Sequence, residues 1–275
     1  MNKILIAFDD RHFSEGAMNF LIRLNEMQPL LLTGIFLSEP DYARAWSYYT
    51  GSIAAPALLP YNEKINREAI QKNIERFEKV CRHNDIDYRT RKTVGDLALQ
   101  ELKKETRFAD TCVIGSEVFY KNFGTDQPNE YLQDALHYAE CPVLLVPEKF
   151  DFPETNILAY DGSESSIYAI KQYACIFPEM SKKETLLVFA KEEIGTSLPD
   201  DEYIKELAAC HYNDLTLMKL HSNSKKEFND WIKNKKGSIL VSGAFGRSVL
   251  SQLFRKSFIA GAISDHQLPI FVSHR

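Results

Sequence analysis

Several small and polar residues in the second half of the chain have the composition of an anion-binding site. Asp161-Gly-Ser163 follows one short apolar run, and Gly243-Ala-Phe-Gly246-Arg247-Ser248 follows another. Two glycines at this spacing let backbone N–H groups approach phosphate oxygens, because no Cβ stands in the way. Ser257 opens a later helical pattern, and the unpaired N–H groups of a helix N-terminus favour an anion. A GxxG pair is also typical of a structural turn, so the motif alone leaves both interpretations open.

The aspartates that close the apolar runs have a second interpretation as well. Asp9 and Asp161 each stand just before a helical pattern, and carboxylates at helix N-termini commonly act as caps. Arg247 and Ser248 could contact a phosphate or simply begin a polar loop. Capping and ligand contact therefore both remain open for the two aspartates.

The same landmarks occur twice in the same order. Residues 4–9 resemble residues 156–161, Val113-Ile-Gly115 resembles Val241-Ser-Gly243, and residues 141–146 resemble residues 268–273. The offsets are 152, 128 and 127 residues, so the first copy holds about 24 additional residues between its first two landmarks. Residues 38–60, rich in Tyr, Ala and Pro, account for them as a long loop or lid. Duplication predicts a first unit of residues 1–149 and a second unit of residues 150–275.

Short apolar runs alternate with helical patterns in each unit. In the first unit the runs occupy residues 3–8, 30–37, 87–93, 111–115 and 142–146. Such continuous runs are typical of parallel strands that helices cover on both faces. Strand–helix alternation predicts the α/β class, with two tandem doubly wound parallel sheets of five strands each. Ligands of such sheets bind beyond the carboxyl ends of the strands, where the strand order reverses.

The composition excludes several classes of protein. A net charge of -5 over 275 residues disfavours a nucleic-acid-binding protein. Five cysteines without a CxxC pair indicate free thiols in a reducing compartment. The chain lacks a signal-like start and a long apolar run, so we expect a cytoplasmic protein without a membrane segment. The patterns HExxH, GxSxG, GxxxxGK[ST] and GxGxxG are also missing, so the sequence predicts no metal site, no nucleophilic hydrolase and no dinucleotide oxidoreductase.

The second unit resembles the universal stress protein family. The nucleotide motif of that family reads G-x2-G-x9-G-[S/T] after a strand. Gly243, Gly246 and Ser257 match three of its four fixed positions, and Lys256 stands where the family has glycine. The resemblance implies that the backbone between residues 243 and 257 holds phosphates, with Arg247, Ser248 and the Lys256 ammonium as further contacts.

The same resemblance implies roles for two residues outside the motif. Asp161 matches the family aspartate that contacts the ribose or adenine region, and Phe189 matches, by a looser alignment, the residue whose backbone meets adenine. The first unit resembles the family in the segments that open and close it, and it retains Asp9 and Gly115. Val118 and the pair 128–129 interrupt its nucleotide motif, so we expect the first unit not to bind ATP, or to bind another ligand.

The resemblance implies an adenine nucleotide alpha hydrolase-like, Rossmann-like fold and a stress-response regulatory function. The second unit would bind an adenine nucleotide, ATP first among them, with or without Mg²⁺, and would hydrolyse it slowly at most. An alternative is an interaction scaffold of the same fold that binds no nucleotide, which Lys256 favours. In single-unit members the last strands pair between subunits, so we expect residues 142–146 and 269–273 to pair within this chain, and a homodimer is also compatible.

Overall fold

A computed structural model describes residues 1–9, 13–37, 63–92, 98–117, 139–191, 198–221, 231–232, 234–243 and 268–273. The loop or lid predicted at residues 38–60 lies outside these ranges. Within them, none of the helices is both long enough and apolar enough to cross a membrane.

The elements follow the predicted alternation of strands and helices. In the first unit they are β1 (Asn2–Asp9), α1 (Glu15–Met27), β2 (Leu30–Leu37), α3 (Glu63–His83), β3 (Asp87–Lys92), α4 (Ala98–Arg107), β4 (Thr111–Gly115) and β5 (Val143–Val146). In the second unit they are β6 (Thr155–Ala159), α7 (Glu164–Ile176), α8 (Pro178–Ser181), β7 (Glu184–Lys191), α9 (Asp201–His211), β8 (Asp214–His221), β9 (Ser238–Gly243) and β10 (Ile270–Ser273). The predicted runs 30–37 and 111–115 coincide with β2 and β4. The run 3–8 is one residue shorter than β1 at each end, and the runs 87–93 and 142–146 differ from β3 and β5 by one residue at one end.

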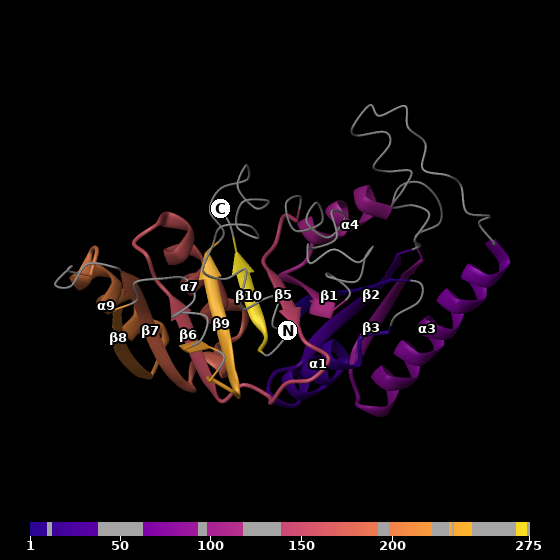
Figure 1. Ribbon diagram of the computed structural model, residues 1–275. Helices are drawn as coiled ribbons and strands as arrows, with labels where there is room; N and C mark the ends of the chain where they lie inside the picture. Colours follow the sequence, from indigo (N-terminus) through magenta and orange to yellow (C-terminus); the bar gives the residue numbers. More distant parts are fainter. Residues whose placement is uncertain are drawn as a thin grey trace.

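The strands in the described part of the chain join into one sheet of ten, in the order β3-β2-β1-β4-β5-β10-β9-β6-β7-β8 (Figure 1). Read from either edge toward the middle, this order is the same for the two units. Neighbouring strands run parallel, except that β5 and β10 pair antiparallel, with Phe271 opposite Leu144. The α/β class and the doubly wound parallel arrangement are therefore confirmed. The two five-stranded halves are continuous, because β5 and β10, within the segments 142–146 and 269–273 that the sequence suggested would pair, satisfy each other's backbone groups at what would otherwise be two edges.

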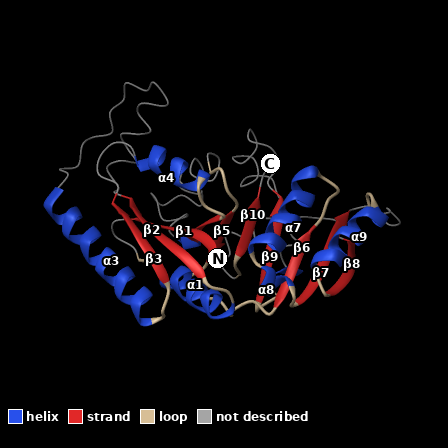
Figure 2. Cartoon of the chain, turned by 180° about the vertical axis from the view of Figure 1, so that it is seen from behind, coloured by secondary structure: helices blue, strands red, loops and turns tan. Residues whose placement is uncertain are grey.

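The described helices α1, α3, α7 and α9 lie along one face of the sheet, and α4 packs on the other (Figure 2). On the first of these faces the core runs without interruption from Phe77 in the first unit to Ile204 in the second. The other face packs against α4 and against Ile232. The first core crosses the β5–β10 junction through Leu144 and Phe271. Burial of apolar surface across that junction stabilises the two units as one body.

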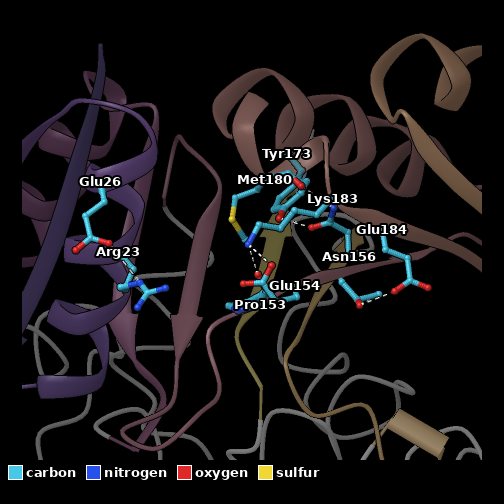
Figure 3. A network of polar contacts seen from close by, with 10 residues as sticks. Arg23, Glu26, Pro153, Glu154, Asn156, Tyr173, Met180, Lys183 and Glu184 are labelled. Carbon is cyan, nitrogen blue, oxygen red and sulfur yellow. Dashed lines mark hydrogen bonds and ion pairs between the residues drawn. The ribbon is translucent and has the colours of Figure 1, made fainter.

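A buried polar network fixes α7 on the sheet of the second unit (Figure 3). The hydroxyl of Tyr173 on α7 donates to Oδ1 of Asn156 on β6 at 2.7 Å. The Asn156 amide donates in turn to the carbonyl of Met180 at 2.8 Å and to Oγ1 of Thr185 at 3.0 Å. Asn156 and Tyr173 are both fully buried, so these bonds satisfy groups that would be costly to leave unpaired. The network sets the distance between α7 and β6, the two elements that flank Asp161.

The segment between β5 and β6 packs against elements of both units. Phe150 and Phe152 contact Phe20 of α1, with ring centroids 6.0 Å and 5.3 Å apart. Lys183 donates to the carbonyl of Pro153 at 2.7 Å and pairs with Glu154 at 2.9 Å (Figure 3). The predicted boundary at residues 149–150 thus lies in a packed connection rather than in a solvated linker.

The reactivity of the five cysteines provides a test of the packing. Cys81, Cys112 and Cys141 are buried, whereas Cys175 and Cys210 are exposed, and all five are free. Burial raises the pKa of the Cys81 and Cys112 thiols to about 12 and also raises that of Cys141, so these three lack the reactive thiolate. We expect a thiol-reactive disulfide reagent to modify two thiols per folded chain and five after unfolding in guanidinium. Rapid modification of a third thiol in the folded protein would contradict this packing.

Candidate functional site

The carboxyl ends of β6 and β9 meet where the strand order of the second unit reverses. From β6 the sheet continues to β7 and β8 on one side and to β9 and β10 on the other (Figure 1). Ala159 of β6 pairs with Ser242 of β9, so Asp161 and Gly243 lie at the same edge of the sheet. This edge is where a doubly wound sheet binds its ligand. Two residues that the sequence analysis selected, 82 positions apart in the chain, are therefore brought together.

Asp161 forms the turn that starts α7. It is exposed, and its Oδ1 accepts a hydrogen bond from the N–H of Ser163 at 2.9 Å. Gly162 has a φ of 83°, a left-handed conformation that suits glycine. Ser163 is the N-cap residue, and its Oγ accepts from the N–H of Ser166 at 3.2 Å. The N-cap of α7 is therefore Ser163, two residues after Asp161, and Asp161 orders the turn before it.

Gly243 has a packing role that the sequence did not reveal. A Cβ on this residue would lie 2.3 Å from the carbonyl carbon of Ser165 and 2.4 Å from the nitrogen of Ser166. The first turn of α7 thus rests on the backbone at the end of β9. This contact places the N-terminus of α7 beside Gly243. The glycine is needed for helix–strand packing whether or not a phosphate binds nearby.

Negative charge gathers on the other side of Asp161, where α9 begins. The hydroxyl of Tyr160 donates to the carbonyl of Pro199 at 2.8 Å. Burial, and then the charges of Asp200, Asp161 and Asp201, raise the pKa of that hydroxyl. Three carboxylates near one hydroxyl make this part of the edge unfavourable for a phosphate chain. A polyphosphate at this edge would therefore extend from Asp161 toward β9 rather than toward α9.

The backbone of β7 identifies a residue that the sequence analysis missed. Phe189 is buried in the core, and the carbonyl of Val188 accepts from the N–H of Tyr160 at 2.9 Å. In a parallel sheet both polar groups of one residue face the same neighbouring strand, and the next residue faces the opposite one. The polar groups of Phe189 therefore face β8, and those of Ala190 face the side on which β6 has ended. Ala190 is thus better placed than Phe189 to meet a base, and only the strand register could identify it.

The two remnants in the first unit occupy the corresponding edge. Asp9 is the last residue of β1 and Gly115 is the last residue of β4, and these strands pair through Ala7 and Ile114. The side chain of Asp9 lies outside the described part of the chain. Ser14, whose Oγ accepts from the N–H of Ala17 at 3.2 Å, is the N-cap of α1.

Comparison with known proteins identifies the fold. No protein-family model and no curated protein matches the sequence. Among solved structures, a universal stress protein from Archaeoglobus fulgidus DSM 4304 is similar with a TM-score of 0.71 and 14% identity, over 100% of this chain and 96% of that one. The chain has the universal stress protein fold. A protein of unknown function from Pseudomonas aeruginosa PAO1 is also similar, with a TM-score of 0.54 and 9% identity over 100% of this chain and 92% of that one. At these identities the likeness establishes the fold and leaves the function open.

The remaining predicted contacts of the universal stress protein motif lie outside the described residues: Gly246, Arg247, Ser248, Lys256 and Ser257. The structure places the two ends of their segment, Gly243 on β9 and Ile270 at the start of β10, on neighbouring strands. Across the ranges that are described, the structure holds no group of three or more His, Cys, Asp or Glu side chains arranged for a metal ion.

Proposed function

We propose that this chain is a stress-response regulatory protein that binds an adenine nucleotide, with ATP as the first candidate, at the carboxyl edge of its second unit. The observation that carries the proposal is the meeting of Asp161, the α7 N-terminus and Gly243 at the point of strand-order reversal. The universal stress protein fold supports it, since this edge is where the matched motif begins.

The described residues suggest how the nucleotide would lie. The phosphates would continue from Gly243, against which the first turn of α7 packs, and would extend away from the carboxylates at the start of α9. The ribose would lie near Asp161, which uses Oδ1 for its own turn. The base would lie beside Ala190. Mg²⁺ would accompany the phosphates as part of the ligand. We propose no catalytic residue, and we expect ATP hydrolysis to be slow at most.

A scaffold that binds no nucleotide is the second candidate, and two observations favour it. Gly243 is already required by packing, and Asp161 is already required by its turn. Under either proposal we place the protein in the cytoplasm. The β5–β10 pairing would let one chain form the body that two single-unit chains would otherwise assemble.

Calorimetric titration with Mg-ATP tests the proposal. We expect saturable binding by the wild-type protein and a loss of at least about 10-fold in affinity for Gly246→Val, because a Cβ there would block N–H contacts worth about 1.5 kcal/mol or more each. Asp161→Asn should also bind about 10-fold more weakly, while its unfolding midpoint stays unchanged. The asparagine oxygen can still accept from Ser163, so this variant separates the charge of Asp161 from its turn.

Three other results would contradict the proposed site or function. Absence of heat at millimolar ATP would support the scaffold. Wild-type affinity in both variants would show that ATP binds elsewhere on the chain. Phosphate release well above background would require an enzymatic role that we do not propose.

A further inference from the structure

In the first unit, the N-terminus of α1 already holds an anion from the chain itself. The carboxylate of Glu148, just after β5, accepts a hydrogen bond from the N–H of Gly16 at 2.9 Å. Gly16 lies in the first turn of α1, where backbone N–H groups have no helical partner and the helix dipole favours negative charge. Glu148 is 132 residues away in the chain, so this contact belongs to the tertiary fold and not to local capping.

Two further features hold Glu148 in this position. Its own N–H donates to both carboxylate oxygens of Glu117, just after β4, at 2.9 Å and 3.0 Å. A Cβ on Gly16 would lie 2.0 Å from the carbonyl oxygen of Pro147 and 2.6 Å from Cα of Glu148. The segment at 147–148 therefore lies directly against the first turn of α1. No separate phosphate could reach the Gly16 N–H without displacing it.

An aromatic ring fills the neighbouring space. Phe13 precedes the N-cap of α1 and stacks on Phe8 of β1, with centroids 4.7 Å apart and planes 10° from parallel. The guanidinium of Arg76 lies 4.5 Å from the centroid of the Phe13 ring and pairs with Glu15. Contact with both an aromatic ring and a guanidinium is an environment that suits a nucleobase.

The second unit has different residues at each of these positions. The N-cap residues Ser14 and Ser163 correspond, so Phe13 corresponds to Gly162. The offsets of the repeat place Phe245 at the position of Glu117 and Arg275 at the position of Glu148. The ring and both carboxylates are thus specific to the first unit. In the second unit a glycine, a phenylalanine and an arginine replace them.

We propose that the first unit is closed by internal substitutes for a ligand: the Glu148 carboxylate takes the place of a phosphate, and the Phe13 ring takes the place of a base. Glu117 positions Glu148 through its backbone N–H. The first unit consequently binds no nucleotide in the wild-type protein. This inference concerns the first unit alone and does not depend on whether the second unit binds ATP.

Rescue by inorganic phosphate tests the role of Glu148. Glu148→Ala should lower the unfolding midpoint by about 3–6 °C, because a charge-assisted hydrogen bond is lost. In a ¹⁵N-resolved NMR spectrum, the amide proton of Gly16 should move upfield in this variant. Added phosphate at constant ionic strength should return it toward the wild-type position. Glu26→Ala, which removes an exposed carboxylate from the same helix, is the control and should leave the Gly16 signal unchanged with and without phosphate.

A second variant keeps the test valid if Glu148→Ala does not fold. Glu148→Gln keeps a neutral acceptor of the same shape, so it should fold and show a smaller upfield shift with a weaker response to phosphate. A Gly16 signal that ignores phosphate in both variants would overturn the role of Glu148, as would a wild-type signal that moves with phosphate. Because Gly16 reports only on the first unit, binding of phosphate to the second unit cannot imitate either result.

The role of the Phe13 ring is tested by replacing Phe13 with glycine, the residue that the second unit has at the corresponding position. In Phe13→Gly combined with Glu148→Ala, adenosine monophosphate should shift the Gly16 amide with an affinity about 5-fold or more above that of inorganic phosphate, because stacking on Phe8 and Arg76 adds to the anion contact. In Glu148→Ala alone the two probes should bind equally. Equal affinities in the double variant would overturn the role of Phe13 and leave that of Glu148 standing.

Discussion

Gly243→Ala is expected to destabilise the protein by about 3–5 kcal/mol, a large effect for the addition of one methyl group. The new Cβ would lie 2.3 Å from a backbone carbon of Ser165, well inside the 3.4 Å at which ordinary contact begins. A flexible side chain could move aside, but the first turn of α7 cannot. It is held by its Ser163 cap and, further along the helix, by the Tyr173–Asn156 bond. The strand and the helix would have to separate.

Gly34→Ala is the matched control for this prediction. Its Cβ would meet the ring of Phe77 at 3.0 Å, and a ring can shift by the few tenths of an ångström needed. We expect this variant to lose at most about 1 kcal/mol. Urea denaturation of both variants measures the difference. Equal stability of Gly243→Ala and the wild-type protein would show that α7 does not rest on β9 as described. The only remaining role for Gly243 would then be ligand binding.

Asn156→Ala should have the second large effect, a loss of about 3–5 kcal/mol. It removes the acceptor of the Tyr173 hydroxyl and the donor to the Met180 carbonyl, and it leaves a cavity in a fully buried site. Burial raises the pKa of Tyr173 well above its usual value, so the hydroxyl remains protonated and cannot avoid the loss by ionising. Tyr173→Phe removes one bond of the same network and should cost about 1–2 kcal/mol.

A double-mutant cycle separates these contributions. The double variant should be less destabilised than the sum of the single variants, because the Tyr173–Asn156 bond is counted in both. Tyr203→Phe is the control, since Tyr203 is exposed on α9 and its hydroxyl should contribute little. Losses below about 0.5 kcal/mol for both Asn156→Ala and Tyr173→Phe would contradict the network.

Much of the fold could be read from the sequence because its signals are local. The runs at 30–37 and 111–115 are continuous and apolar, and strands of that kind need covering on both faces, which fixes the α/β class. The repeated landmarks indicated two units of one doubly wound fold, and the rule for such sheets predicted that Asp161 and Gly243 lie at one edge. The adenine contact that we propose is Ala190, one residue after the Phe189 of the sequence prediction, because the direction in which backbone groups face depends on strand register, which periodicity does not encode.

The sequence by itself determined the class of fold, and it predicted a duplication and the edge at which a ligand would bind, since each follows from residue type and spacing along the chain. Only the tertiary structure decided that β5 and β10 pair antiparallel, that Gly243 makes room for α7, and that Glu148 satisfies the N-terminus of α1. These three outcomes depend on contacts between residues 78 to 132 positions apart or on pairing between the units. Such contacts leave no pattern in the neighbouring residues, because they are selected by packing and by the need of buried polar groups for partners.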